Sequence, residues 1–131
     1  MSTVFEHRVQ VRWRDSDALG HVNHAVFLTY LEEARDAFFE TALGSEPLYV
    51  VARIEIDLRA EVRHTDPWVA VRIEPERRGT TSLTTRETIL TSEGQLAAAA
   101  RVVTVRWDPG ARKPVPFTGT ERDRLTAAMA G

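Results

Sequence analysis

The sequence predicts an α+β protein in which a five-stranded antiparallel sheet packs against one long helix. Apolar residues recur at spacings of three and four over about 20 residues that follow Asn23. One stretch before this helix and four after it are rich in strand-forming residues, and short turns join the last four. Strands joined by short turns pair antiparallel, and a long amphipathic helix must bury its apolar side. The helix is therefore expected to lie on one face of the sheet.

The first strand is expected at residues 4–13, where apolar and polar side chains alternate. The long helix follows, from about Asn23 to Leu43, with no Pro or Gly inside it. Asn23 is a preferred N-cap residue, and Gly44 suits the left-handed conformation that ends many helices. The apolar side of this helix is formed by Phe27, Leu31, Ala34, Phe38 and Ala42.

The remaining strands follow the helix in order. Residues 53–63 alternate strictly between apolar and charged side chains, which predicts a half-buried strand with a solvated charged face. The third strand is expected at residues 68–74, and Pro75 indicates an edge or a bulge near its end. Further strands are expected at 82–91 and 96–107. In the second of these stretches, three valines favour a strand over the helical propensity of four consecutive alanines. A short helix is expected at 120–129.

The composition is that of one soluble domain spanning residues 1–131. The chain has 131 residues, of which 43% are hydrophobic and 27% are charged. The net charge of −2 argues against nucleic acid or an anionic membrane as the main partner. The absence of Cys excludes disulfides, thiolate nucleophiles and zinc–thiolate sites. No apolar run reaches the length of a signal core or a membrane span, so a cytoplasmic location is expected.

The loop before the long helix concentrates polar chemistry. It contains two carboxylates one residue apart, a glycine, two histidines and an asparagine: Asp15, Asp17, Gly20, His21, Asn23 and His24. The N-terminus of a helix presents unpaired N–H donors and a partial positive charge, which favour anions and developing oxyanions. On composition alone, a turn-forming loop with a capping asparagine explains these residues equally well.

The run Asp15-Ser16-Asp17-Ala18-Leu19-Gly20-His21-Val22-Asn23, followed by an aromatic residue and then Glu32-Glu33-Ala34-Arg35, resembles the signature of hotdog-fold acyl-CoA thioesterases. The 4-hydroxybenzoyl-CoA thioesterase branch is the most similar in order and spacing from Val11 to Arg35. The strand pattern extends the resemblance over nearly the whole chain. The resemblance implies the hotdog fold, in which a five-stranded antiparallel sheet wraps a long central helix. It also implies a homodimer or tetramer with active sites at the subunit interface.

In this family, the catalytic carboxylate matches Asp17. It acts either as the nucleophile that attacks the thioester or as the base that activates water, and the sequence does not separate these routes. Gly20 allows close backbone approach, and N–H groups from His21 to His24 would polarise the thioester carbonyl. Asp15 is expected to order the loop instead. His24 has either a supporting polar role or none, as an exposed residue at the start of the helix.

No cofactor is expected. A metal is not expected either, because the H-x-x-x-H spacing of ligands on one helix face is missing. Relatives often have Tyr where this chain has Phe27, so the resemblance implies a more apolar acyl pocket that would accept aromatic or medium aliphatic groups.

Coenzyme A would bring phosphates to a basic turn formed by Arg77, Arg78, Gly79 and Thr80, with Arg59 as a further candidate. Each of these arginines is also explained as an ordinary surface cation. The carrier of the acyl group is either coenzyme A or an acyl-carrier protein.

Two other functions stay open. Hotdog dehydratases or hydratases act on similar acyl thioesters, but their histidine-containing patterns do not match Asp15-Ser16-Asp17 with Gly20-His21. A non-catalytic protein that binds acyl thioesters would keep the helix and the sheet without any need for Asp17. Hydrolysis of acyl-CoA esters separates these functions from a thioesterase.

Overall fold

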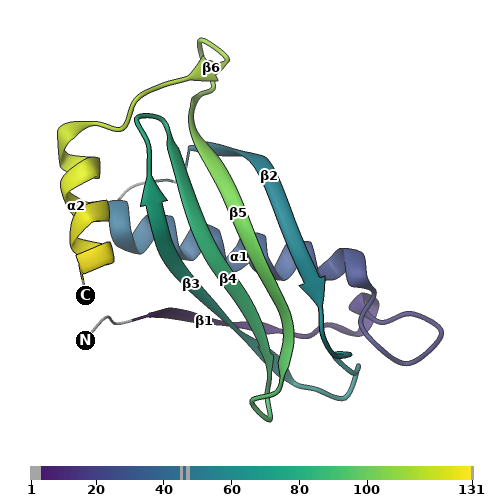
Figure 1. Ribbon diagram of the computed structural model, residues 1–131. Helices are drawn as coiled ribbons and strands as arrows, with labels where there is room; N and C mark the ends of the chain where they lie inside the picture. Colours follow the sequence, from purple (N-terminus) through teal and green to yellow (C-terminus); the bar gives the residue numbers. More distant parts are fainter. Residues whose placement is uncertain (1–3, 45, 47, 131) are drawn as a thin grey trace.

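The computed structural model describes residues 4–44, 46 and 48–130, and these residues form two α-helices and one mixed-length antiparallel sheet (Figure 1). The long helix α1 is His24–Leu43, and α2 is Gly119–Ala130. The sheet follows the order β1-β3-β4-β5-β2, with β6 paired to β5. Its strands are β1 (Phe5–Gln10), β2 (Tyr49–Leu58), β3 (Trp68–Arg78), β4 (Ser82–Thr91), β5 (Leu96–Asp108) and β6 (Lys113–Pro114).

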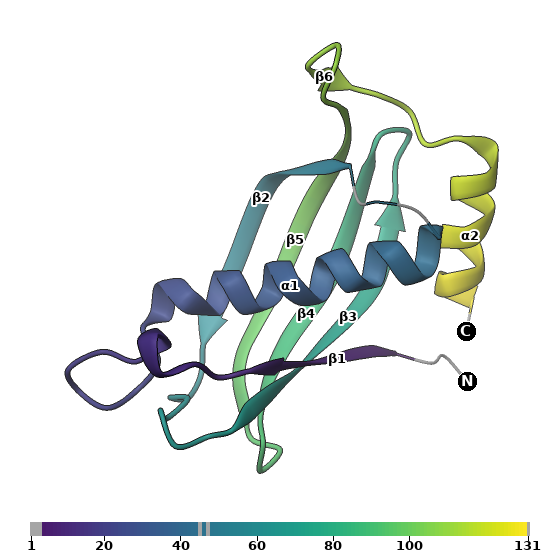
Figure 2. The same ribbon diagram turned by 180° about the vertical axis from the view of Figure 1, so that it is seen from behind.

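Helix α1 crosses one face of the sheet, and α2 lies beside its C-terminal end (Figure 2). The Asn23 side chain accepts a hydrogen bond from the Ala25 N–H at 2.9 Å, so it caps the helix. Gly44 ends the helix with a φ of 68°, which a side chain would disfavour. The predicted bounds of this helix are therefore confirmed, and so is the α+β class.

The core lies between α1 and the face of the sheet that α1 covers. The helix contributes its aromatic and aliphatic row, and β3, β4 and β5 contribute every second residue, as strand geometry requires. Its central members are Tyr30, Leu31, Ala34, Phe38, Val69, Val71, Ile73, Leu83, Ile89 and Val102. No helix in the described part of the chain is long and apolar enough to cross a membrane.

A buried ion pair joins α1 to β4 inside this core. The guanidinium of Arg35 donates to both carboxylate oxygens of Glu87, at 3.0 and 2.7 Å, and the Thr85 hydroxyl donates to Glu87 at 2.7 Å. Arg35 and Glu87 are both buried. Burial lowers the pKa of Arg35, but the bonds and the charge of Glu87 raise it more, so the pKa of Arg35 lies above its usual range. The pair therefore fixes how α1 lies on the sheet.

Several strand predictions need correction. The predicted first strand is shorter, because the chain leaves β1 after Gln10 and forms a 3₁₀ turn at Trp13–Asp15. The predicted five strands become six through the two-residue β6. The third strand runs on to Arg78, with an irregularity between Pro75 and Arg77 that matches the predicted bulge. The strand expected at 82–91 and the helix near the C-terminus are confirmed.

The strand expected at residues 53–63 is the largest error. It is β2, which begins at Tyr49 and ends at Leu58. Its apolar face is also only partly covered: Tyr49 and Ile56 pack against the core, and most of the other apolar side chains are exposed. Val51, Ile54 and Leu58 lie opposite Thr104, Val102 and Ala98 of β5, and these three partners are buried beneath α1. Directly opposed residues share a face, so the apolar side chains of β2 point to the α1 side of the sheet.

The α1-facing strip of β2, defined as Val51, Ile54 and Leu58, is nevertheless uncovered. These side chains are 42%, 37% and 53% exposed. On α1, Leu28 is exposed by 41%, and it continues the row of Glu32 and Asp36, which line a hollow together with Val51. An apolar strip therefore lies open beside the first half of α1, at a strand with no neighbour on its outer side among the described residues.

Candidate functional site

The site begins with the tight loop of residues 16–22, between the 3₁₀ turn and α1. Ser16 and Val22 pair across its base, the Asp17 N–H donates to the His21 carbonyl at 2.9 Å, and the Gly20 N–H donates to the Asp17 carbonyl at 3.2 Å. Gly20 has a φ of 83°, a conformation that residues with a side chain rarely adopt. The sequence therefore folds back on itself just where the catalytic carboxylate was expected.

A second segment holds this loop from the side. The Val22 N–H donates to the Val62 carbonyl at 2.7 Å, and His21 pairs with Arg63. His64 contacts the Gly20 carbonyl through its own N–H at 3.3 Å and its ring Nδ1 at 2.7 Å. A carbonyl only accepts, so Nδ1 carries a proton in this contact. The segment after β2 thus belongs to the site rather than to the strand.

The Asp17 carboxylate is held without being buried. Its Oδ1 accepts from the Leu19 N–H at 2.9 Å, and its Oδ2 lies 3.3 Å from Nδ1 of His21. The side chain is 28% exposed. Its neighbours orient both oxygens, and enough of the group faces solvent to reach a substrate or a water molecule.

Asp17 opens onto a hollow of about 300 Å³. The hollow is lined by Trp13, Arg14, Ser16, Asp17, Ala18, Gly20 and His64. The Trp13 ring packs edge to face against the His64 ring, with centroids 6.1 Å apart. Trp13 is 83% exposed. An aromatic wall, a cation and a carboxylate therefore share one shallow space. Within residues 4–44, 46 and 48–130, no three His, Asp or Glu side chains gather as a metal site would need.

The other residues predicted near this loop have different positions. Asn23 caps α1, as expected, and its N–H also donates to the Asp15 carbonyl at 3.0 Å. His24 is exposed at the first residue of the helix. Phe27, predicted to line the acyl pocket, is buried against Tyr30, with ring centroids 6.5 Å apart. The exposed apolar side chain in this part of the helix is that of Leu28.

The structure does not bring the predicted phosphate-binding residues together. Arg59 directly follows β2, on the segment that leads to Val62 and the loop. Arg77 and Arg78 belong to the end of β3 rather than to the turn, which is formed by Gly79 and Thr80. Strand β3 begins beside the loop, where the Val11 N–H meets the Pro67 carbonyl. Ten residue steps of about 3.3 Å place Arg78 about 30 Å away, at the opposite end of the sheet.

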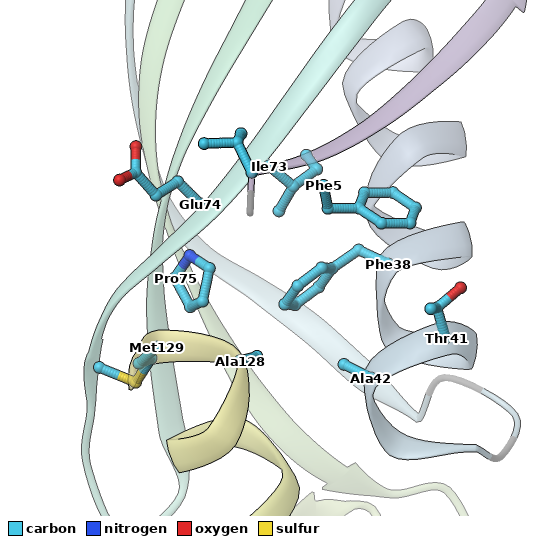
Figure 3. A pocket seen from close by; sticks show the side chains of 10 residues that line it. Phe5, Phe38, Thr41, Ala42, Ile73, Glu74, Pro75, Ala128 and Met129 are labelled. Atoms are coloured by element: carbon cyan, nitrogen blue, oxygen red, sulfur yellow. The ribbon is translucent and has the colours of Figure 1, made fainter. Parts of the chain in front are cut away.

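A second hollow, of about 280 Å³, lies at that opposite end, between α1, β1, β3 and α2 (Figure 3). Most of its wall is apolar, as Phe5, Phe38, Ile73 and Met129 show, and Thr41 and Glu74 are its polar members. Phe38 lies 14 residues along α1 from His24, a distance of about 20 Å. This hollow is therefore remote from the Asp17 carboxylate and is not part of the same site.

Sequence reasoning missed three side chains that build the site: Trp13, Tyr30 and His64. Trp13 was assigned to the first strand, and neither Tyr30 nor His64 was assigned to the site. Only Trp13 carried a usable signal, because it directly precedes the loop. Nothing local in the sequence shows that the segment 62–64 returns to Gly20 and Val22.

Comparisons with known proteins identify the family of the chain. The sequence profile of the Thioesterase-like superfamily matches residues 11–125. The chain is 31% identical over 120 residues to the acyl-CoA thioester hydrolase YbgC of Escherichia coli O6:H1, a match that covers 86% of this chain and 89% of that protein.

Two solved structures are similar in fold. A thioesterase complexed with coenzyme A and Zn from Thermus thermophilus is 35% identical, with a TM-score of 0.82 and coverage of 98% of this chain and 95% of that one. A 1,4-dihydroxy-2-naphthoyl-CoA thioesterase from Synechocystis, Slr0204, has a TM-score of 0.78 at 20% identity, with coverage of 98% of this chain and 96% of that one.

Proposed function

The chain belongs to the Thioesterase-like superfamily, with its hotdog-type fold, and we propose that this thioester hydrolase cleaves acyl-coenzyme A esters with Asp17 as its catalytic carboxylate. One observation carries the proposal. Asp17, which the resemblance matches to the family's catalytic carboxylate, is held by the Leu19 N–H, remains partly exposed, and faces a hollow beside Trp13 and His64. The chain has no Cys that could serve as a thiolate nucleophile.

Two routes use the same geometry. In the first, Asp17 attacks the thioester carbonyl and expels the coenzyme A thiolate, and water then hydrolyses the mixed anhydride. In the second, Asp17 takes a proton from water, the water oxygen bonds to the carbonyl carbon, and the carbon–sulfur bond breaks. In both, negative charge develops on the carbonyl oxygen. The N-terminus of α1, around His24, supplies backbone dipoles that favour this charge.

The acyl group would lie along the open apolar strip. Val51, Ile54 and Leu58 face the α1 side of the sheet, and Leu28 is exposed on α1 itself. Phe27 is buried against Tyr30, so its side chain would not line this surface directly. This strip forms one apolar wall of the acyl pocket, and a single protomer supplies no opposite wall. The width of the pocket therefore depends on what covers β2. Aromatic and medium aliphatic acyl groups both fit its chemistry.

The missing side is a second copy of the chain. A sheet edge with unpaired backbone groups and exposed apolar residues is a site of strand pairing, and identical chains pair about a two-fold axis. Pairing of two β2 strands antiparallel would continue the sheet from one protomer into the other. It would also cover the α1-facing strip of both copies.

The same pairing gives the basic turn a role. The loop lies at the Leu58 end of β2, and the turn after Arg78 lies at the Leu48 end, because Arg106 bonds Thr81 while Trp107 bonds Leu48. Antiparallel pairing places these two ends side by side in the dimer. The partner's Arg77 and the partner's Arg78 would then stand three to four strand spacings from Asp17, about 15–20 Å. That span suits the phosphates of a coenzyme A whose thioester lies at Asp17, with Arg59 nearer.

The experiment is release of free thiol from a panel of aromatic and medium-chain acyl-CoA esters. Asp17→Asn keeps the size of the side chain but removes the base and the nucleophile. We expect at least about a 100-fold loss of kcat with little change in folding. Asp123→Asn, a matched change on the exposed face of α2, should leave kcat unchanged. Near wild-type turnover by Asp17→Asn would refute this mechanism. A wild type that binds acyl-CoA without hydrolysing it would favour the binding-protein function.

A further inference from the structure

The loop that carries Asp17 has almost no core of its own. From residue 16 to residue 21 every side chain is at least partly exposed, and Val22 is the first buried one. Such a loop cannot fix its orientation by packing. The position of Asp17 relative to α1 therefore depends on hydrogen bonds, which come from the segment at Val62–His64 and from the two ends of the loop.

Both ends meet at Asp15. Before the loop, Oδ2 of Asp15 accepts from the Arg12 N–H at 2.9 Å. After the loop, the Asp15 backbone carbonyl accepts from the Asn23 N–H at 3.0 Å. Asp15 is only 4% exposed, although it lies two residues from the partly exposed Asp17. One buried residue thus ties together the entry to the loop and the cap of α1.

A third contact comes from inside the helix. The Tyr30 hydroxyl donates to Oδ2 of Asp15 at 2.7 Å. Tyr30 lies in the second turn of α1, is completely buried and stacks against Phe27. Its ring is therefore held by the core, and the hydroxyl gives Asp15 a fixed point on the rigid helix.

We propose that Tyr30 is a positioning residue, which fixes the Asp17 loop on α1 through its hydrogen bond to Asp15. The inference rests on the proposed function, because it assigns Tyr30 a task in the reaction of Asp17. Tyr30 touches neither substrate nor the reacting atoms. It keeps the carboxylate at a constant distance from the start of α1, where the carbonyl oxygen would be stabilised.

The ionisation of the pair supports this arrangement. Burial raises the pKa of Asp15, but the bonds from Tyr30 and from the Arg12 backbone, together with the Arg12 guanidinium, lower it more. Burial and the bond to Asp15 raise the pKa of Tyr30 far above its usual range. At neutral pH the pair is therefore a phenol that donates to a carboxylate, which is a short, charge-assisted hydrogen bond.

The test is Tyr30→Phe, which keeps the ring and removes the hydroxyl. We expect kcat to fall by about 10- to 100-fold while KM stays within about twofold, because a misplaced carboxylate weakens the transition state more than binding. Backbone amides of residues 17–22 should also exchange their hydrogens faster.

A matched control lies near the other end of the same helix. The Tyr49 hydroxyl donates to Oδ1 of Asp36 at 2.6 Å, so Tyr49→Phe removes a comparable Tyr–Asp bond away from the loop. This variant should keep wild-type hydrogen exchange in the loop.

Wild-type kcat and unchanged loop exchange in Tyr30→Phe would overturn the inference. So would an equal rise of loop exchange in both variants, since that would mark a general loosening of α1. A wild type without thioesterase activity would refute the proposed function instead. Loop exchange would then still decide whether Tyr30 positions the loop.

Discussion

Asp15 and Asp17 are identical side chains separated by a single residue, and the fold gives them opposite surroundings. Asp15 is buried and accepts from Tyr30 and Arg12, whereas Asp17 remains partly exposed and is oriented by the Leu19 N–H. The difference comes from Tyr30, which lies a whole loop and two helical turns later in the chain. A carboxylate that is saturated with donors is a structural group, and one with a free side remains available for chemistry.

The buried carboxylate predicts a pH dependence of stability. The pKa of Asp15 lies below the usual 3.8, so its ionised form stabilises the fold above that value. This contribution is lost as the pH falls through the still lower pKa of the folded state. Asp15→Asn should therefore cost about 1–3 kcal/mol of unfolding free energy at pH 7, and the cost should shrink below about pH 3.8.

Urea unfolding of both proteins between pH 7 and pH 3 measures this difference. Asp123→Asn on the exposed face of α2 is the control and should show no comparable change. A cost of Asp15→Asn that stays constant down to pH 3 would contradict the assignment of the ionised form as the stabilising one.

At the scale of elements, the Arg35–Glu87 pair is the polar link between α1 and β4. Both groups are buried and fully bonded, so removal of one partner leaves the other charge without compensation. Arg35→Leu should therefore destabilise the protein by about 3–5 kcal/mol. The double variant Arg35→Leu, Glu87→Leu should recover much of this loss, because no unpaired charge remains.

Denaturant midpoints of the two single variants and the double variant, read as a double-mutant cycle, measure the coupling. As a comparison, Arg72→Leu breaks an exposed pair with Glu6 and should cost less than about 1 kcal/mol. Additive losses for Arg35 and Glu87 would show that the two side chains stabilise the fold independently.

The elements that the sequence predicts well are those whose ends carry local signals. Asn23 and Gly44 delimit α1, and the turns on either side of residues 82–91 delimit β4. The alternation of apolar and charged residues misplaces β2, because the pattern continues to residue 63 although the strand ends at Leu58. Beyond Leu58 the chain turns, and the Arg59 and Ala60 N–H groups both meet the Ala97 carbonyl. A period of two reports which side chains share a face, and it does not report where pairing stops.

The same limit applies to the site. Asp17, Gly20 and Asn23 lie in one short segment, so their order in the sequence places them together. His64 reaches Gly20 from 44 residues away, and Tyr30 reaches Asp15 from inside the apolar row of α1. Such contacts depend on tertiary packing, which no single-segment pattern encodes.

At the scale of the whole molecule, the two ends of the sheet supply different parts of the proposed site. The Asp17 loop lies at one end, and the Arg77–Thr80 segment lies about 30 Å away at the other. A single protomer therefore cannot offer both to one substrate of coenzyme A size. The dimer proposed from β2 joins the loop of one copy to the basic segment of the other.

Subunit mixing tests this arrangement. Asp17→Asn should lose kcat, and Arg77→Ala with Arg78→Ala should raise KM for acyl-CoA about tenfold with kcat retained. When the two variants are unfolded, mixed and refolded together, about half of the dimers should be mixed, and each mixed dimer should contain one intact site. At substrate concentrations below KM, activity should then exceed the mean of the separate variants.

Activity equal to that mean would contradict a site shared between protomers. A monomeric mass in light scattering at micromolar concentration would contradict the dimer itself. Each protein refolded alone is the matched control, since it reports losses that come from refolding rather than from subunit exchange.

The open edge of β2 has a consequence for enzymology at high dilution. If the two walls of the acyl pocket come from different protomers, only the dimer has a complete site. The number of complete sites then follows the law of mass action. Where enzyme is dilute enough to dissociate, initial velocity should rise with the square of the enzyme concentration rather than in proportion to it. A specific activity measured there would describe assembly as much as catalysis, and the decay of the rate after dilution would report the lifetime of the dimer.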